Sequence, residues 1–226
     1  MSDGTESTLL RPGQWLPPNN SEDDVEALFK SSSSPDMYAN YAVYLCSKAC
    51  ELISDRSKFE ELGVQNGCNS QQFLKRWSRL WEQLDAWMLC RPKEMLPVAT
   101  ARTTPFPNIL FAHWAAISSN QLYHTSCVLL LAANTKQRSS LGASQSSFVM
   151  WHVKRICGIS IANPHEGCLN NAIQPLWIAG RLLTHSEEQM LVVKTIRHIE
   201  ASTGWTASWR IRDLENTWGC KIRVDS

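Results

Sequence analysis

Apolar residues recur at alternating spacings of four and three along most of this 226-residue chain. The clearest case is the stretch 70–90, which Pro92 terminates. Its apolar line consists of Phe73, Trp77, Leu80, Leu84 and Trp87. Spacings of this kind place side chains on one face of an α-helix. Because no stretch alternates with period two for long enough to make a sheet, the sequence predicts an all-α fold.

Other stretches show the same periodicity and are also expected to be helical. A helix should begin at Pro35, with Ser34 as its cap, and end near Ser54. The stretch 92–107 carries four prolines, so we expect a long loop there. Further helices are expected at about 108–134, 145–161 and 168–183.

The stretch 108–134 is apolar enough to resemble a membrane span. Polar residues interrupt it, namely Ser118, Ser119, Asn120, Gln121, His124, Thr125 and Ser126. Burying so many polar groups in lipid is costly. We therefore expect the central helix of a soluble protein, with no membrane partner.

The stretch 175–218 predicts a helical hairpin. Ser186 and Gln189 have the spacing of a capping box, which would start the first helix. Gly204 is placed to end that helix in the left-handed conformation. A second helix should start near Thr206. Two tryptophans are expected to wedge the corner, Trp205 and Trp209.

Residues 1–36 are rich in Ser, Pro, Asn and Asp, which is typical of a disordered tail or linker. Within them, 21–29 mixes acidic residues with Val25, Leu28 and Phe29. This mixture fits either a disordered activation segment or a short docking helix or tail. Residues 37–222 should then form one helical domain of about seven helices.

The charge of the chain is nearly balanced, with 22 Lys and Arg against 21 Asp and Glu. A protein that grips DNA through its phosphates needs a basic face. The basic residues near the C-terminus have acidic residues between and around them, which favours a solvated surface. They are Arg210, Arg212, Lys221 and Arg223. The ten tryptophans are expected to pack in the core.

Eight cysteines are present, but no two form a C-x-x-C pair. The N-terminus shows no signal-peptide pattern, so we expect reduced intracellular thiols. The nearest approach to a metal site is His152, Cys157, His165 and Cys168, whose spacing matches no compact ligand pattern. The stretch 142–146 lacks the second glycine of a nucleophile elbow. We expect no metal, no cofactor, no catalytic residues and no enzymatic activity.

Five runs of sequence, in this order and spacing, resemble the fungal-specific transcription-factor domain. They are RWSRLWEQLDAWMLCRP at 76–92, PFPNILF at 105–111, NQLYHTSCVLLL at 120–131, WHVKRICGISIANPHEGC at 151–168, and the run from QPLWIAGRLLT at 174–184 through IEASTGWTASWRIRDLENTWG. The resemblance covers roughly residues 37–220. It implies a helical regulatory domain of the kind that lies behind a zinc binuclear cluster in fungal regulators.

That zinc cluster requires six close-set cysteines in two C-x-x-C pairs, which this chain lacks. The resemblance therefore implies a nuclear regulator that controls genes through protein partners of the transcription machinery or a DNA-binding regulator, without binding a specific DNA site alone. The resemblance does not decide whether this chain is a stand-alone regulator, a pseudogene-like remnant or a truncated gene product. The alternative is a helical interaction scaffold with no transcriptional role. A small effector held between helices, bordered by the Trp-rich core and 92–107, is a further hypothesis, with no ligand-binding residue assigned.

Overall fold

A computed structural model shows eight α-helices and one β-hairpin within the residues that it describes, 21–32, 34–135 and 142–222. The all-α prediction is confirmed. In chain order the elements are α1 Glu22–Lys30, α2 Pro35–Leu62, α3 Ser70–Leu89, a 3₁₀ turn Lys93–Met95, β1 Ala99–Ala101, β2 Asn108–Leu110, α4 Trp114–Thr135, α5 Gly142–Ala162, α6 Glu166–Gly180, α7 Ser186–Thr203 and α8 Ser208–Trp218.

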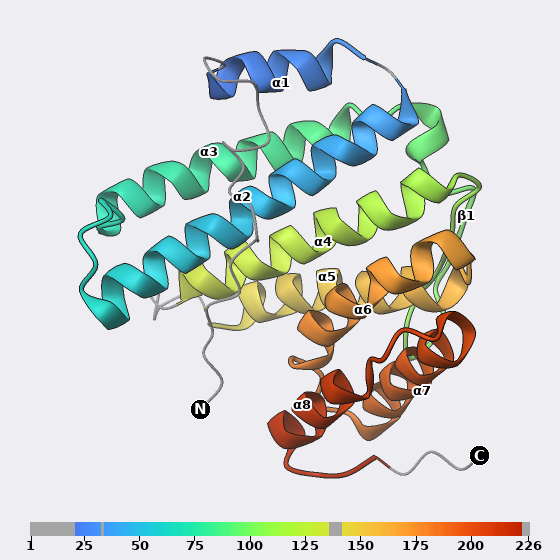
Figure 1. The fold of residues 1–226 in the computed structure, drawn as a ribbon. Coiled ribbons are helices and arrows are strands. Elements are labelled where there is room, and N and C mark those ends of the chain that lie inside the picture. Colours follow the sequence, from blue (N-terminus) through green and yellow to red (C-terminus); the bar gives the residue numbers. More distant parts are fainter. Residues whose placement is uncertain (1–20, 33, 136–141, 223–226) are drawn as a thin grey trace.

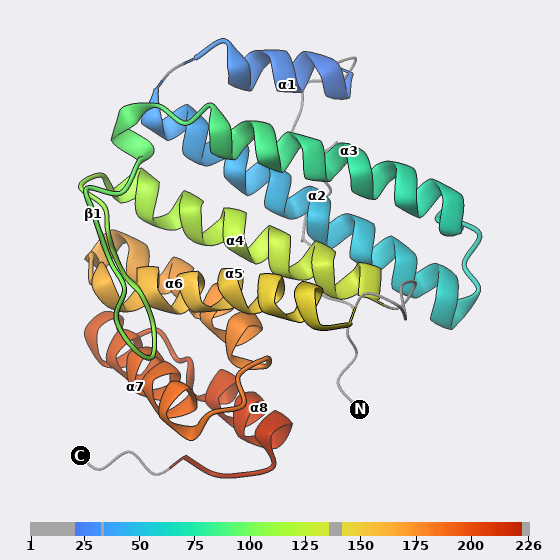
Figure 2. The ribbon, with the colours of Figure 1, turned by 180° about the vertical axis from the view of Figure 1, so that it is seen from behind.

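Helix α4 lies at the centre of the molecule. It packs against α2 and α3 on one side and against α5 and α6 on the other, and α7 and α8 lie beyond α6 (Figures 1 and 2). Two of its buried hydroxyls are satisfied within the helix, since Ser119 Oγ donates to the Ala115 carbonyl at 2.6 Å and Thr125 Oγ1 donates to the Gln121 carbonyl at 2.8 Å. The polar residues of this stretch are therefore compatible with burial between other helices.

None of the helices in the described part of the chain is both long and apolar enough to cross a bilayer.

Two large apolar clusters form the core. One joins α2, α3 and α4 and contains Leu45 and Trp87, and the other joins α5 to α8 and contains Ile156 and Leu176. Indole N–H groups add polar links between helices. Trp87 Nε1 donates to the Tyr38 carbonyl at 3.0 Å, which fixes α3 against α2. Trp87 thus packs in the core as predicted and also donates a hydrogen bond there, and Trp177 is buried as well. The prediction is wrong for four other tryptophans, which are 43–63% exposed: Trp114, Trp151, Trp205 and Trp209.

The ends of the helices agree with the sequence in part. Helix α3 begins where Asn69 accepts a hydrogen bond from the Gln72 amide, and it ends as predicted near Cys90. Helix α2 continues beyond the predicted end at Ser54 to Leu62, where Gly63 has φ of 65°. A glycine adopts this left-handed conformation without the steric cost that other residues meet.

The predicted hairpin 175–218 exists, but some of its details differ. Gly204 ends α7 with φ of 71°, as predicted. The capping box is wrong, because His185 occupies the cap position and Gln189 Nε2 instead donates to the Leu183 carbonyl at 3.0 Å. The prediction that two tryptophans wedge the corner of the hairpin is also wrong, because Trp205 is 63% exposed and Trp209 is 43% exposed.

Residues 92–107 form a loop as predicted, but one that also contains strand β1. The antiparallel pair β1–β2 aligns Ala99 with Leu110 and Ala101 with Asn108. Consequently α4 starts at Trp114 rather than at Asn108. Ile109 of β2 is buried, which attaches the hairpin to the helical body. Strands of three residues are too short to show a period in sequence.

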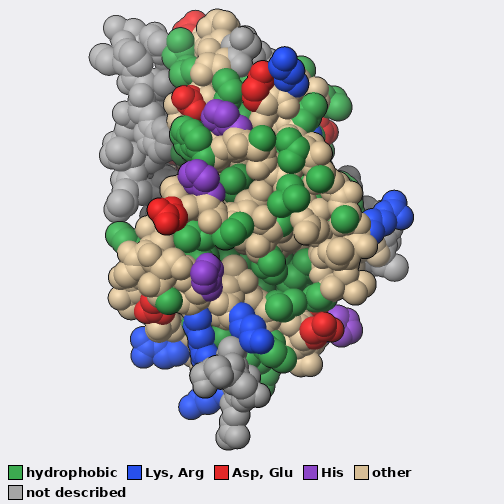
Figure 3. Space-filling model, turned by 90° about the vertical axis from the view of Figure 1, so that its right-hand side faces the viewer, with side chains coloured by type: hydrophobic (Ala, Val, Ile, Leu, Met, Phe, Trp, Pro, Cys, Tyr) green, Lys and Arg blue, Asp and Glu red, His purple; other side chains and the backbone are tan. Residues whose placement is uncertain are grey.

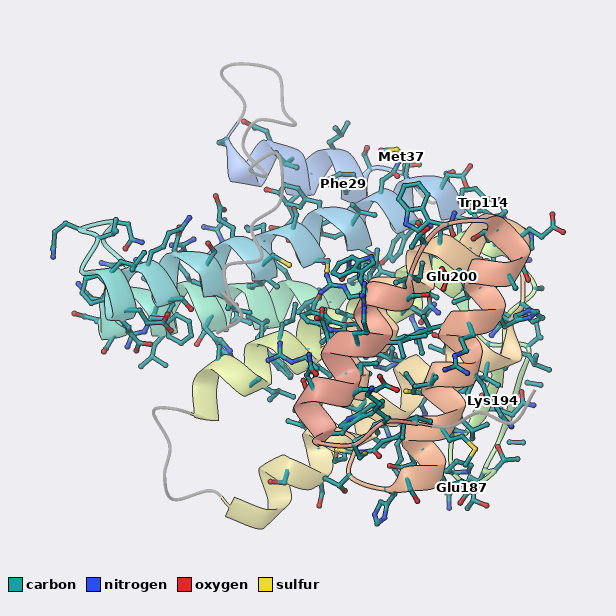
Figure 4. The ribbon with its side chains drawn as sticks, turned by 60° about the horizontal axis from the view of Figure 1, so that its bottom comes forward. Phe29, Met37, Trp114, Glu187, Lys194 and Glu200 are labelled. Atoms are coloured by element: carbon teal, nitrogen blue, oxygen red, sulfur yellow. The ribbon has the colours of Figure 1, made fainter. Side chains whose placement is uncertain are left out.

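Helix α1 lies in the stretch assigned to a tail by composition. Ser21 and Asp24 form a capping box, and Asp24 Oδ2 accepts from the Ser21 amide at 2.7 Å. Phe29 points from α1 toward α2 (Figure 4), and its ring stacks on Tyr41 with centroids 5.0 Å apart. Residues 22–30 therefore form a docking helix, which is one of the two interpretations given above for the stretch 21–29. Residues 1–20 lie outside the described residues.

Gly158 of α5 allows the hairpin to approach closely. A Cβ atom at this position would lie 2.1 Å from the Pro107 carbonyl oxygen. We expect Gly158→Ala to lower the free energy of unfolding by about 1–3 kcal/mol, because the backbone must shift to admit the methyl group. Chemical unfolding followed by circular dichroism measures this change.

Gly167→Ala is the matched control. Its Cβ would meet only the His165 ring at 3.4 Å, an ordinary contact, near the start of α6. This variant should be neutral or slightly stabilised. Equal effects of the two substitutions would contradict the steric explanation.

Candidate functional site

The four residues nearest to a metal-ligand set do not come together. His165 Nδ1 and Cys168 Sγ are 3.8 Å apart at the start of α6, whereas His152 contacts a different partner and Cys157 is buried in another cluster. Burial raises the pKa of the Cys157 and Cys168 thiols, which keeps them protonated. Across the described ranges, no three His, Cys, Asp or Glu side chains are arranged to hold a metal ion.

Two histidines meet between α4 and α5 instead. His124 Nδ1 and His152 Nδ1 are 2.9 Å apart, and the rings are only 2% and 1% exposed. One Nδ1 donates to the other, a contact that two neutral rings make when one carries its proton on Nδ1 and the other carries its proton on Nε2. Burial lowers the pKa of His152 to about 4 and holds that of His124 well below its usual value. This contact was not predictable from the spacing of the two residues, because His124 lies on α4 and His152 lies on α5.

Aromatic rings surround this pair and continue to the surface. Tyr123 stacks on Trp87 of α3 at 5.5 Å and contacts the His124 ring at 5.0 Å. His124 in turn meets the edge of Trp151 at 5.5 Å. The Nε2 atom of His152 is buried without a hydrogen-bond partner. A continuous series of ring contacts therefore runs from α3 through α4 to α5.

An aromatic strip made of Trp77, Trp81, Phe148 and Trp151 lies across α3 and α5. Trp77 and Trp81 stack at 5.2 Å, Trp81 meets Phe148 at 6.2 Å, and Phe148 stacks with Trp151 at 6.3 Å. Phe148 and Trp151 are each 45% exposed. Exposed tryptophans and phenylalanines are enriched in protein interfaces. The strip is therefore a candidate surface for a protein partner.

A positive charge borders the aromatic strip. The guanidinium carbon of Arg155 lies 4.2 Å from the centre of the Trp151 ring. The tryptophans were expected in the core, so this surface was not predicted from the sequence. Each helix does carry two aromatic residues one turn apart, but only the fold brings Trp81 to Phe148.

Arg210 corrects the prediction of a solvated basic surface near the C-terminus. It is 8% exposed, and its guanidinium carbon lies 3.8 Å from the Trp177 ring and 4.0 Å from the Trp209 ring. Its Nη2 also donates to Gln174 Oε1 at 2.7 Å. A guanidinium held between two indoles is not available to a phosphate. Arg223 lies outside the described residues.

Other basic residues line a groove between α2 and α3, but acids accompany them. Arg76 is paired with Asp55 at 2.9 Å, and Glu51 lines the same groove. Figure 3 shows the side of the molecule that carries the β-hairpin, where hydrophobic and neutral side chains cover the middle, Lys and Arg gather at the lower edge, and Asp and Glu are scattered. Neither surface is the continuous basic face that tight DNA binding requires. The basic members of the groove are Lys48, Lys75, Arg76 and Arg79.

Two cavities border the elements named in the ligand hypothesis. The first, which we call the α1 cavity, has a volume of about 560 Å³ and lies between α1, α2 and the end of α3, where Trp87 and Pro92 line it. The second has about 460 Å³ and lies between the hairpin loop 103–108 and α5. Volumes of this size are within the range of small-molecule sites.

Comparison with known proteins gives one similarity to a curated protein. No family model matches the chain, and no solved structure matches it. A protein described as transcription activator AMTR1, from Alternaria alternata, is 32% identical over an alignment of 111 positions, and the match covers 45% of this chain and 14% of that protein. The chain therefore spans only a small part of the relative's length, and it is similar to a fungal transcription activator over that part.

The histidine pair predicts that stability falls as the pH drops from 7 to 5. A histidine in the unfolded chain takes up a proton near pH 6.5, whereas folded His152 remains neutral down to about pH 4. The neutral His152 ring therefore stabilises the folded state fully above pH 6.5. This contribution to the free energy of unfolding falls as the pH drops from 6.5 toward 4, and about 2 kcal/mol of it is lost at pH 5. Urea unfolding at each pH measures the change.

The double variant His124→Leu, His152→Leu serves as the comparison. It removes both titrating rings, so its free energy of unfolding should depend less on pH over the same range. If its pH dependence equals that of the unaltered protein, other groups cause the effect.

Proposed function

We propose that this chain is a transcription-regulatory domain that acts through protein partners. The observation that carries the proposal is the similarity over 111 residues to a fungal transcription activator. The ordered runs that resemble the fungal-specific transcription-factor domain lie on the helices α3 to α8 and on the hairpin, and they support the same conclusion. Under this proposal the protein works in the nucleus and has a binding role rather than a catalytic one.

The aromatic strip is the surface that we assign to partner binding. Its rings offer a large apolar area whose side chains are already held in place by stacking, so little conformational entropy is lost on binding. Trp77 is fixed further by its indole N–H, which donates to the Leu130 carbonyl at 2.9 Å. Arg155 beside Trp151 adds a positive charge. These features fit a partner segment that is apolar and carries an acidic residue.

Contact with DNA is assigned to another module or protein. The formal net charge is +1, and Arg210 is enclosed by two tryptophans. The basic groove between α2 and α3 contains the pair Arg76–Asp55. A surface of this kind releases few counterions from a DNA duplex, so binding of DNA by this chain alone should be weak.

The second candidate is an interaction scaffold with no transcriptional role. The aromatic strip favours it as well, because an exposed row of aromatic rings serves any protein partner. Only an effect on transcription separates the two functions.

A tethering experiment tests the proposal. The chain, fused to an unrelated DNA-binding domain, should change the output of a reporter gene in fungal cells, upward or downward, relative to that DNA-binding domain alone. The double variant Phe148→Ala, Trp151→Ala should lose this effect, because removal of two central aromatic contacts weakens partner binding by roughly tenfold or more. Reporter activity at equal protein levels is the measurement.

Trp205→Ala is the matched control, since it removes an exposed tryptophan on the turn between α7 and α8, away from the aromatic strip. It should leave the reporter response unchanged. No reporter response from the unaltered fusion would favour the scaffold. A response that survives in the double variant would remove the aromatic strip from the proposal.

The charge distribution also predicts the behaviour of the isolated chain with DNA. In a gel-shift assay with a pool of duplex sequences, we expect no sequence-specific complex at physiological salt. A salt-resistant complex with a defined sequence would contradict the assignment of DNA contact to another module.

A further inference from the structure

Two cysteines of α2 lie in contact, one helical turn apart. Cys46 and Cys50 are both free thiols, and their side chains are hydrogen-bonded to each other. Positions four residues apart lie on the same face of a helix, so the contact follows from their spacing. Cys46 also contacts the Ser126 side chain of α4, which packs along α2 (Figure 1). These contacts hold the two sulfur atoms side by side.

The helix keeps this pair from closing into a disulfide. The Cβ atoms of residues four apart on a helix lie about 5–6 Å from each other, whereas a disulfide needs about 3.5–4.5 Å. Helix α2 is continuous from Pro35 to Leu62 and would have to distort to bring the two Cβ atoms closer. An atom placed between the two sulfurs removes this conflict, because each sulfur then keeps its position on the intact helix. The pair is therefore suited to a bridging atom.

The pair combines access from solvent with a reactive thiol. Both side chains are partly exposed, whereas Cys68, Cys127 and Cys157 are buried. The hydrogen bond from Cys50 lowers the pKa of Cys46, and burial opposes part of this shift. Burial has the larger effect on Cys127, whose pKa it raises to about 12. The thiolate is the form that attacks and binds soft centres, so the α2 pair is better placed to react than these buried cysteines.

The number of ligands decides which centres the pair can hold. Among the residues that the structure describes, no group of three His, Cys, Asp or Glu side chains could hold a metal ion. Structural zinc, which takes four protein ligands, is therefore not matched. Soft centres that bond to two sulfurs are matched, because thiolates are soft ligands. Trivalent arsenic with one carbon substituent is such a centre, since it has two bonds left for sulfur.

We propose that Cys46 and Cys50 form a dithiol site for soft, thiophilic centres, with monosubstituted trivalent arsenicals as the matching class of ligand. In the reaction with an arsenoso group, R–As=O, the two S–H bonds and the bond between arsenic and oxygen break, and two As–S bonds form. The two protons leave with the oxygen as one water molecule. Arsenic stays trivalent, so no oxidant or reductant is required. This site goes beyond the proposed function, which does not require a ligand.

Phenylarsine oxide is a suitable probe for the full chain. In mass spectrometry of the intact protein, the chain should gain the mass of one reagent molecule minus one water. The adduct should survive an excess of glutathione, a monothiol, and should be reversed by dimercaptopropanol, a dithiol. The reason is that the second As–S bond forms within the chain, at an effective concentration that a free monothiol does not reach.

Single substitutions test the assignment to this pair. Cys46→Ser and Cys50→Ser each leave one thiol and should lower the affinity in the presence of glutathione by roughly a hundredfold or more. The double variant Cys90→Ser, Cys220→Ser is the matched control, since it removes two exposed thiols outside the pair and should bind as the unaltered chain does. Thermal melting establishes that each variant is folded, and Cys46→Ala or Cys50→Ala replaces a serine variant that is not.

An unaltered chain that gains no glutathione-resistant adduct would overturn the proposal. So would a folded variant at position 46 or 50 that keeps the adduct, or loss of the adduct in the control variant, because either result would place the arsenical on other thiols. The assay uses purified protein without a reporter gene, so its outcome is independent of whether the chain regulates transcription.

Discussion

The polar side chains of the buried helix α4 need partners, and the surrounding helices are arranged so that most of these groups have one, although Gln121 Oε1 has none. Gln121 Nε2 donates to Ser160 Oγ of α5 at 2.9 Å, and Asn120 Nδ2 donates to the Met95 carbonyl at 3.2 Å. His124 pairs with His152 of α5. A buried group without such a partner costs about 1–3 kcal/mol. These bonds therefore fix the position of α5 along α4, which apolar packing alone specifies less strictly.

Tryptophan has three different roles in this fold. Trp87 and Trp218 donate hydrogen bonds between helices, and the Trp218 bond reaches the Gly180 carbonyl at 2.9 Å. Trp177 forms one wall of the Arg210 site, while Trp151 is exposed on the aromatic strip. The indole is suited to each role because it combines a large ring with a single donor. An abundance of tryptophan therefore does not by itself indicate how much of it is buried.

The parts of the fold that were predictable from sequence depend on local signals. The apolar spacing of α3 and the glycine at position 204 act within one or two turns, and both predictions were confirmed. The extension of α2 past Ser54 was not predictable in this way, since Asp55 is held there by Arg76 of α3. The burial of Arg210, the histidine pair and the aromatic strip likewise depend on contacts between distant segments. The residues that line the two cavities likewise come from distant segments and were not predictable from the sequence.

The series of ring contacts from Trp87 through Tyr123 and His124 to Trp151 connects the wall of the α1 cavity with the aromatic strip. Displacement of one ring alters the packing surface of the next, because protein interiors leave little free space. If a molecule in the α1 cavity and a protein on the aromatic strip each moved these rings on binding, the two binding events would be thermodynamically linked. Each would then change the affinity for the other by the same factor, whichever of them arrives first.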